Sequence, residues 1–578
     1  MSGSRAVQFE SADARLGRAL SQVNQTDQVQ RLLLPISAAL AAFVCLFGHL
    51  GAIGLVGPDE PRYAWISRAM AQTGDWITPR LYGQPWFEKP ILYYWAAALG
   101  FRAHLSAEWA ARLPSSIAAL VAALAIGWLG WRHYARGLSY AETPGLLAPL
   151  CFSTSVAVIG SARSASPDML FSASIALAMA SAAAIFRRAG ALRGAHVCVA
   201  ENAHRDIVPL MFFGLSLGLG VLAKGPAAIA LAGGAIAIWA GATRQWKAAF
   251  RVAHPLAIVV FCLVALPWYV ACAIRNPNFL RIFLVQHNVE RYFTPMFQHR
   301  QSFWFFGPIV LLAFAPWTAL LWPVAQEGLR VWRKKRWIDS PGFFIACWAI
   351  FPVAFFSFSQ SKLPGYVLPS IAPLALLSSV ALSRAFEKTR ATALAAAIAV
   401  TCVIVSLVAS HAAGRFDWAA VVTDEGARTI PLLSNVALAV TIVIAVGMVV
   451  AGYRRNLIVT LVLCTLWVVV SVEALNLRVL PLLDYFYSAR PHAAFMRNDR
   501  RPDRIFTYRL PRAWNYGLAF YTWRELPEWS PSDPQPALVL TTPTGANEIR
   551  KLDRISGALD EHYAGIRYVP VTAAPISR

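Results

Sequence analysis

The sequence has few charged residues. Only 14% of its 578 residues are Asp, Glu, Lys or Arg, whereas 57% are hydrophobic and the mean hydropathy is +0.49. Soluble domains carry about 25% charged residues, so the composition excludes an ordinary soluble protein and indicates an integral membrane protein. Acidic residues are the scarcer kind, which leaves a formal charge of +22. That excess could suggest nucleic acid, but the basic residues gather in short loops between apolar runs, as the positive-inside rule predicts.

Four further features are missing. No cysteine follows Cys464, which predicts no disulfide framework in the C-terminal part. No Walker or Rossmann glycine pattern and no internal repeat is present, so nucleotide-driven transport has no visible source of energy. The first thirty residues lack the basic start, short apolar core and cleavage site of a signal peptide, and we expect the first span to remain as an anchor.

Long apolar runs dominate what is present. About thirteen runs of span length occur, near residues 31–55, 110–131, 142–160, 169–186, 207–223, 226–242, 255–274, 304–326, 342–357, 365–384, 391–410, 431–452 and 456–474. Threading them with the N-terminal segment 1–30 in the cytoplasm places the basic loops inside throughout. The odd count then puts the C-terminal part outside. The sequence predicts a mainly α, polytopic membrane protein with a transmembrane domain over 31–475.

The C-terminal part, 476–578, differs in character. Charged residues and prolines increase, and short alternating runs lie at 504–509, 537–541 and 566–571, with a helix-compatible piece at 547–553. Alternation of period two is typical of half-buried strands. We therefore predict a small soluble α/β domain on the outer side.

The first outer loop, 57–109, contains the same sequence pattern twice. Asp59-Glu60-Pro61-Arg62 and Glu88-Lys89-Pro90 each place acidic and basic side chains around a proline that precedes an aromatic, helix-like run. Proline suits the first helical position, so we expect Glu60 and Lys89 in extended backbone at helix starts. Free N–H groups there, with Arg62 and Lys89, suit a phosphate that has carboxylates beside it. The alternative is a solvated loop held to the headgroups by its aromatic residues.

Other outer loops add charged residues. These are Arg163 and Asp168 in the second outer loop, Lys224 in a short turn, His287, Glu290 and Arg291 in the loop 275–303, and Lys362 with Tyr366. Several of these residues have a structural alternative to a role in a functional site. The alternatives are an ordinary ion pair for Arg163 and Asp168, snorkelling for Lys224, and structural hydrogen bonds for the histidines. A zinc site of His287, Glu290 and Glu88 lacks tight ligand spacing. Because all these charged residues fall on the outer side, they predict one polar site at the outer surface of the membrane that the spans cross.

These motifs resemble the GT-C superfamily of integral-membrane glycosyltransferases. An Asp-Glu pair after the first span, a following Glu-Lys-Pro, an acidic residue in the second outer loop and a C-terminal soluble domain are similar to that superfamily. GPDEPRYA, FEKPILYYW, LAKGP and SKLPGYVLP look most like the bacterial lipid A 4-amino-4-deoxy-L-arabinose transferases. The resemblance covers residues 31–475. It implies a GT-C bundle with periplasmic amphipathic helices in the bacterial inner membrane.

The resemblance also implies the chemistry. The donor would be undecaprenyl-phosphate-aminoarabinose and the acceptor a phosphate of lipid A, a lipopolysaccharide modification that gives polymyxin resistance. Asp59 would be the principal catalytic carboxylate and Asp168 the second. Substrate and lipid phosphate would contact a wider set of residues: Glu60, Arg62, Glu88, Lys89, Arg163, Lys224, His287, Arg291, Lys362 and Tyr366. No cofactor is required, although relatives imply that a divalent ion such as zinc can sit near Glu88. We expect a monomer.

Two alternatives stay open. A polyprenyl-phosphate sugar transferase could use a protein hydroxyl or another glycan as its acceptor, and the sequence does not separate these cases. A lipid-linked-sugar transporter would also need many spans, but it predicts charges near mid-membrane and related halves. A scaffold or receptor would leave the two charged loop segments unexplained.

Overall fold

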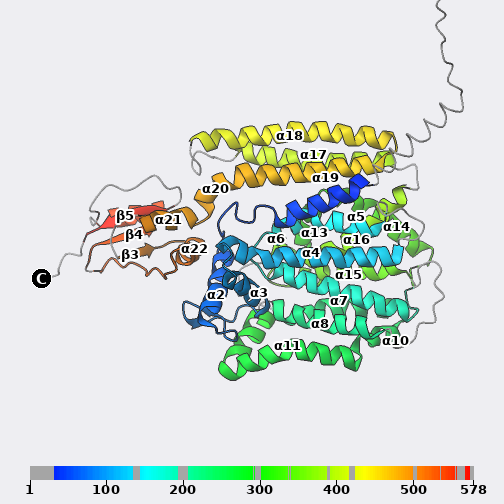
Figure 1. Ribbon diagram of the computed structural model, residues 1–578, viewed down its shortest axis with the longest axis horizontal. Helices are drawn as coiled ribbons and strands as arrows, with labels where there is room; N and C mark the ends of the chain where they lie inside the picture. The colour runs from blue at the N-terminus through cyan, green and yellow to red at the C-terminus, as the bar shows by residue number, and fades with distance from the viewer. Residues whose placement is uncertain are drawn as a thin grey trace, which may run out of the picture.

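The computed structural model describes residues 32–134, 143–192, 206–290, 292, 301–335, 337–338, 340–386, 391–415, 424–498, 504–533, 535–552, 555 and 566–572. The predicted N-terminal segment 1–30 and Arg291 lie outside these residues. A bundle of long helices with roughly parallel axes fills most of the molecule, and a small sheet with short helices projects from one end of it (Figure 1).

The bundle contains the elements that the apolar runs predict. Eight helical stretches in the described residues are long and apolar enough to span a membrane: α4 (Ala107–Tyr134), α7 (Asp168–Arg188), α8 (Ile207–Lys224), α11 (Pro255–Arg275), Pro364–Ala385 with α16 (Leu368–Phe386), α17 (Ala391–Arg415), α18 (Asp424–Tyr453) and Leu457–Tyr487 with α19 (Leu457–Ala474) and α20 (Leu480–Tyr487). Three shorter apolar helices are Leu32–Phe47, α9 (Ala227–Thr243) and α15 (Pro341–Ser357).

Two predicted spans are broken. α5 (Pro144–Ser153) and α6 (Val156–Ala162) meet at 66°, and Phe303–Ala313, which includes α13 (Phe306–Ala313), meets Trp317–Arg333, which includes α14 (Leu321–Arg333), at 111°. The breaks face each other: the amide of Val156 donates to the carbonyl of Ala315 at 3.0 Å. Trp317 Nε1 donates to Thr154 Oγ1 at 2.9 Å. Broken helices are tolerated at membrane depth where protein satisfies the freed groups.

With these pairs, the described helices correspond one for one to the predicted spans, which confirms the prediction of a mainly α, polytopic membrane protein. Short elements connect them: α10 (Trp246–Ala249), the 3₁₀ turns Phe250–Ala253, Phe303–Phe305, Trp317–Leu320 and Pro364–Val367, and the π-helices Arg281–Glu290 and Leu475–Val479.

Helix α7 lies at the centre of the bundle. Within its apolar window 94% is buried by protein, against 22% for α11 and 28% for α17 and α18. Its sequence is rich in Ala and Ser, and small side chains let neighbouring helices approach closely without a gap. The first residue of α7 is Asp168, so close packing of small residues fixes this carboxylate where several helices meet.

The first outer loop folds into α2 (Asp59–Thr73), the two-residue strands β1 (Arg80–Leu81) and β2 (Gln84–Pro85), and α3 (Leu92–Arg102). Figure 1 shows α2 and α3 at the end of the bundle that carries the small sheet. The expected helix starts are displaced. Pro58 precedes α2, so Glu60 is helical rather than extended, and α3 begins two residues after Pro90. The first turn of α2 thus carries its own carboxylates, which complement the helix dipole.

The C-terminal elements are α21 (Arg490–Asn498), β3 (Ile505–Tyr508), α22 (Arg512–Thr522), β4 (Ala537–Thr541), α23 (Pro543–Arg550) and β5 (Arg567–Val571). The strands lie in the three runs that the alternation predicts, in the order β3-β4-β5, with β3 parallel and β5 antiparallel to β4. The expected boundary at residue 476 falls inside the helical stretch Leu457–Tyr487, because an apolar tail extends the last span.

Candidate functional site

Arg62 pairs with two carboxylates in a charged cluster at the end of the bundle. It lies in the second turn of α2, and its Nη2 is 2.5 Å from Oδ1 of Asp59 and 2.9 Å from Oε2 of Glu88. Lys89 Nζ lies 3.3 Å from the other oxygen of Glu88. The two motifs that the sequence singled out therefore meet through their charged side chains. Asp59 is the most exposed residue of the cluster, with 61% of its side chain accessible to solvent.

Burial shapes the charges of this cluster. Burial disfavours the charged guanidinium, but neighbouring groups, Glu88 first and then Tyr63 and Asp59, outweigh it and raise the pKa of Arg62. Burial also disfavours the charged form of Glu88, which by itself would raise the pKa of this carboxyl. Lys89, Arg62 and His287 together outweigh burial and lower the pKa to about 2. Buried Arg62 and partly buried Glu88 and Lys89 thus form a fixed pattern of charges beside the accessible carboxylate of Asp59.

Glu60, which is predicted to contact the substrate, has several partners within the protein. Its side chain is buried and receives Nε and Nη2 of Arg112 at 3.1 and 2.7 Å. The amides of Val56 and Ala165 donate to the same carboxylate at 2.9 and 2.7 Å. Neighbouring residues on a helix point about 100° apart, so Asp59 faces the site while Glu60 faces α4. Glu60 therefore joins α2, α4 and the segment before Asp168.

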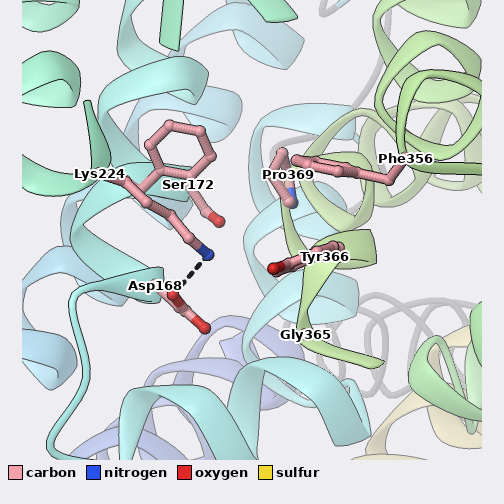
Figure 2. Close-up of a pocket in the computed structure, with 8 residues that line it drawn as sticks. Asp168, Ser172, Lys224, Phe356, Gly365, Tyr366 and Pro369 are labelled. Atoms are coloured by element: carbon pink, nitrogen blue, oxygen red, sulfur yellow. Dashed lines mark hydrogen bonds and ion pairs between the residues drawn. The ribbon is translucent and has the colours of Figure 1, made fainter. Parts of the chain in front are cut away.

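A second cluster surrounds the start of α7. Lys224 Nζ lies 2.6 Å from Oδ1 of Asp168. Figure 2 shows both side chains pointing into a small pocket that Tyr366 faces from the other side. Lys224 Nζ is 5.0 Å from the centre of the Tyr366 ring, a cation–π geometry. The pocket is lined by Asp168, Phe171, Ser172, Lys224, Phe356, Gly365, Tyr366 and Pro369.

Local structure explains this pocket. Asp168 opens α7 and Lys224 closes α8, so each charge lies at the helix end whose dipole it complements. Gly225 follows at φ +86°, a conformation that side chains rarely adopt, and it ends α8 immediately after the lysine. Tyr366 lies in the 3₁₀ turn before α16. A Cβ on Gly365 would sit 3.3 Å from Asp168 Oδ2, so the absence of a side chain there leaves room for the carboxylate.

Other predicted residues take structural partners. Arg163 Nη2 donates to Asn476 Oδ1 at 2.5 Å, so Asp168 pairs with Lys224 and the simple Arg163–Asp168 ion pair is wrong. Lys362 is buried and donates to the carbonyl of Gln301 at 2.9 Å. His287 lies in the π-helix Arg281–Glu290, where it contributes to the low pKa of Glu88. His287 and Glu290 thus lie in a π-helix within the predicted outer loop.

The described residues do not fit a metal ion at Glu88. No group of three or more His, Cys, Asp or Glu side chains within them has the geometry to hold one. Both oxygens of Glu88 face cations, Arg62 and Lys89. A divalent ion placed there would meet two positive charges, so we derive no step through a metal.

The sequence also misses contributors to the site. Arg112 gives no signal in the sequence beyond an arginine near the start of a span, which reads as a headgroup contact. Tyr516, in α22, brings its ring to 5.6 Å from Cζ of Arg62. No motif near Tyr516 could reveal this contact, because the two residues lie at opposite ends of the chain.

Comparison with known proteins supports the same architecture. The model of the family described as dolichyl-phosphate-mannose-protein mannosyltransferase matches residues 39–283. Undecaprenyl phosphate-alpha-4-amino-4-deoxy-L-arabinose arabinosyl transferases are 34% identical over 321 residues in Edwardsiella ictaluri, and 34% over 350 residues in Serratia proteamaculans. These alignments cover 55% and 60% of this chain, and 54% and 58% of the relatives. The match thus spans little more than half of these relatives.

A solved structure extends the similarity over nearly the whole chain. The crystal structure of ArnT from Cupriavidus metallidurans bound to undecaprenyl phosphate superposes with a TM-score of 0.73 at 22% identity, covering 93% of this chain and 97% of that one. This level of similarity establishes a shared fold. Together the comparisons confirm the resemblance that the sequence motifs indicate.

Proposed function

We propose that this chain is a membrane glycosyltransferase that moves 4-amino-4-deoxy-L-arabinose from undecaprenyl phosphate to a phosphate of lipid A. The observation that carries the proposal is the arrangement of Asp59, Arg62 and Glu88 beside Lys89, at the same end of the bundle as the small sheet. The named relatives and the shared fold with a structure bound to undecaprenyl phosphate support it.

The reaction suits these side chains. An oxygen of the acceptor phosphate attacks the anomeric carbon, the bond from that carbon to the lipid phosphate breaks, and the lipid phosphate leaves with the electron pair. A phosphate acceptor is already anionic at neutral pH, so a general base contributes less than it would for a hydroxyl. We assign Asp59, the exposed carboxylate, to orienting the acceptor and stabilising the oxocarbenium-like transition state and the ammonium group of the sugar.

The cations would serve the leaving group. Lys224, Lys89 and Arg62 are the basic side chains of the two clusters, and each is held in place by a carboxylate. A lipid phosphate that enters would exchange part of this pairing for its own charge. Neutralising that phosphate requires no nucleotide and no redox cofactor. Asp168 would then keep Lys224 in place between turnovers, and Tyr366 would close the pocket.

The proposed setting follows from the substrates. Both lipids can diffuse laterally to a site at the periplasmic face of the bacterial inner membrane, with the chain working as a monomer. An added ammonium group lowers the negative charge of lipid A, which weakens the attraction of cationic peptides such as polymyxin.

The family model favours a second candidate. Its description names a protein acceptor and a dolichyl-phosphate-linked mannose. Transfer to a protein hydroxyl would require Asp59 as a true base, because a hydroxyl must lose its proton during attack.

The deciding experiment uses cells that make the lipid-linked aminoarabinose but lack their own transferase. We expect mass spectrometry of lipid A to show one added aminoarabinose with the wild-type chain and none with Asp59→Ala at equal membrane abundance. Glu327→Gln, in α14 at the other end of the bundle, is the control and should act like the wild type. Unmodified lipid A with well-expressed wild type would reject lipid A as the acceptor.

A further inference from the structure

The C-terminal part of the chain docks on the helix that carries Asp59. Trp523, the residue after α22, stacks on Trp65 of α2 with ring centres 4.2 Å apart, and Arg68 lies 4.2 Å above the same Trp523 ring. Tyr521 Oη accepts a hydrogen bond from the amide of Leu55 at 2.7 Å and donates to Glu108 at 2.8 Å. Helix α22 thus contacts both the segment just before the first outer loop and α4.

Ion pairs and hydrogen bonds stabilise this docking. Asp484 Oδ1 accepts from the amide of Gly54 at 2.6 Å, and its other oxygen receives Arg490 Nη2 at 2.7 Å. Arg490 also reaches the carbonyl of Gly51 at 3.0 Å and Glu108 at 3.3 Å. Phe520 of α22 is fully buried in the same apolar core as the bundle helices. Such contacts hold α22 in one position relative to α2.

Tyr516 projects from this anchored helix toward Arg62. It precedes Phe520 by one helical turn, so the two share a face of α22. Its ring centre lies 5.6 Å from Arg62 Cζ, and the rings of Tyr63 and Trp86 lie at 5.3 and 5.5 Å. Two of the three rings around the guanidinium come from the first outer loop, and the third comes from the C-terminal part.

We propose that Tyr516 is a positioning residue, which holds the Arg62 guanidinium against Asp59 and Glu88. This inference rests on the proposed transferase function, in which Asp59 acts on the substrate. The exposed Asp59 carboxylate is oriented by its contact with Arg62. A guanidinium enclosed by three aromatic faces has few alternative positions, so the ring of Tyr516 acts on Asp59 through Arg62. The C-terminal part of the chain therefore contributes a residue, Tyr516, to the site.

The test compares ring removal with ring retention. Tyr516→Leu should lower kcat for sugar transfer by roughly 3- to 30-fold, the effect of losing one cation–π contact, with little change in KM for the lipid-linked donor. Tyr516→Phe, which keeps the ring, should stay within about twofold of wild type. The matched control is Tyr508→Leu, because the Tyr508 ring also lies over a guanidinium, that of Arg509, at 5.5 Å, but in strand β3.

Two readouts separate positioning from general destabilisation. In an Arg62→Gln background, which removes the cation, Tyr516→Leu should add less than twofold; an undiminished effect would overturn the proposal. Fluorinated phenylalanines at position 516 keep the shape of the ring while weakening its negative face, so kcat should fall with each added fluorine. A flat response would likewise overturn it, and this series serves even if Tyr516→Leu does not fold.

A third readout needs no activity. Arg62 is buried in the wild type, so phenylglyoxal, which modifies accessible arginines, should label it slowly, and Tyr516→Leu should speed that labelling at least several-fold. Equal labelling rates in the two proteins would refute the inference. If the wild type transferred no sugar, the proposed function would fail while this labelling still decided whether Tyr516 holds Arg62.

Discussion

Lys224 Nζ lies 2.6 Å from Asp168 Oδ1, although 56 positions separate the two residues in the chain. Helices α7 and α8 run in opposite directions, so the end of one lies beside the start of the other. The pair is only partly exposed, at 17% for Lys224 and 32% for Asp168. A partly desolvated pair at the mouth of a bundle can respond to an entering phosphate more strongly than a surface pair would.

Removing the cation of this pair should impair transfer. We expect Lys224→Met to lower kcat roughly 100-fold, the usual effect of losing one charge-stabilising group, at near-normal membrane abundance. The control is Lys247→Met, an exposed lysine in α10 at the opposite end of the bundle. Quantitative mass spectrometry of the product measures the rate. A variant that keeps more than half of the wild-type rate would show that Lys224 is structural.

Adding a methyl group at Gly365 should disturb Asp168. The new Cβ would lie 3.3 Å from Oδ2 of that carboxylate, so the side chain must move by a few tenths of an ångström. Because small displacements at reacting groups cost activity steeply, we expect Gly365→Ala to lower kcat by roughly 3- to 10-fold. Gly307→Ala adds a methyl group in open space and should have no effect. Equal rates for the two variants would contradict the assigned crowding.

The stabilising effect of Glu88 should depend on pH. Its pKa is lowered to about 2 from an ordinary value of 4.5, so the ionised carboxylate stabilises the fold fully above pH 4.5 and loses this effect as the pH falls toward 2. We expect Glu88→Gln to lower the Tm in detergent by a constant amount between pH 5 and 7. That difference should shrink below about pH 4.5. A difference that grew as the pH fell would reverse the assigned sign.

Breaking the Glu60–Arg112 pair should affect stability rather than chemistry. Both side chains are buried, and Arg112→Met leaves the carboxylate of Glu60 without its charged partner. Such losses cost about 3–5 kcal/mol, so we expect low membrane abundance and a lowered Tm. Asp59→Asn, by contrast, should retain abundance while losing transfer. Normal abundance and Tm for Arg112→Met would show that the pair is dispensable for folding.

Much of the architecture could be predicted from the sequence. Each apolar run of span length becomes a helix or a bent helix pair, since a helix satisfies its own backbone groups in lipid. The three alternating runs of the C-terminal part become β3, β4 and β5 because period two places one face of each strand on a core. The bends at Thr154 and Ala315 were not predictable, because the groups that satisfy them come from each other's span.

The candidate site, like the fold, was predictable from the sequence only in part. The sequence by itself determined which residue types gather at one end of the bundle, since hydropathy and loop charge fix the direction in which each span runs. Only the tertiary structure decided their partners: it buries Glu60 on Arg112, leaves the adjacent Asp59 exposed, and brings Tyr516 to Arg62. The physical reason is that hydropathy is a property of one segment, whereas an ion pair or a ring contact depends on the packing of two segments.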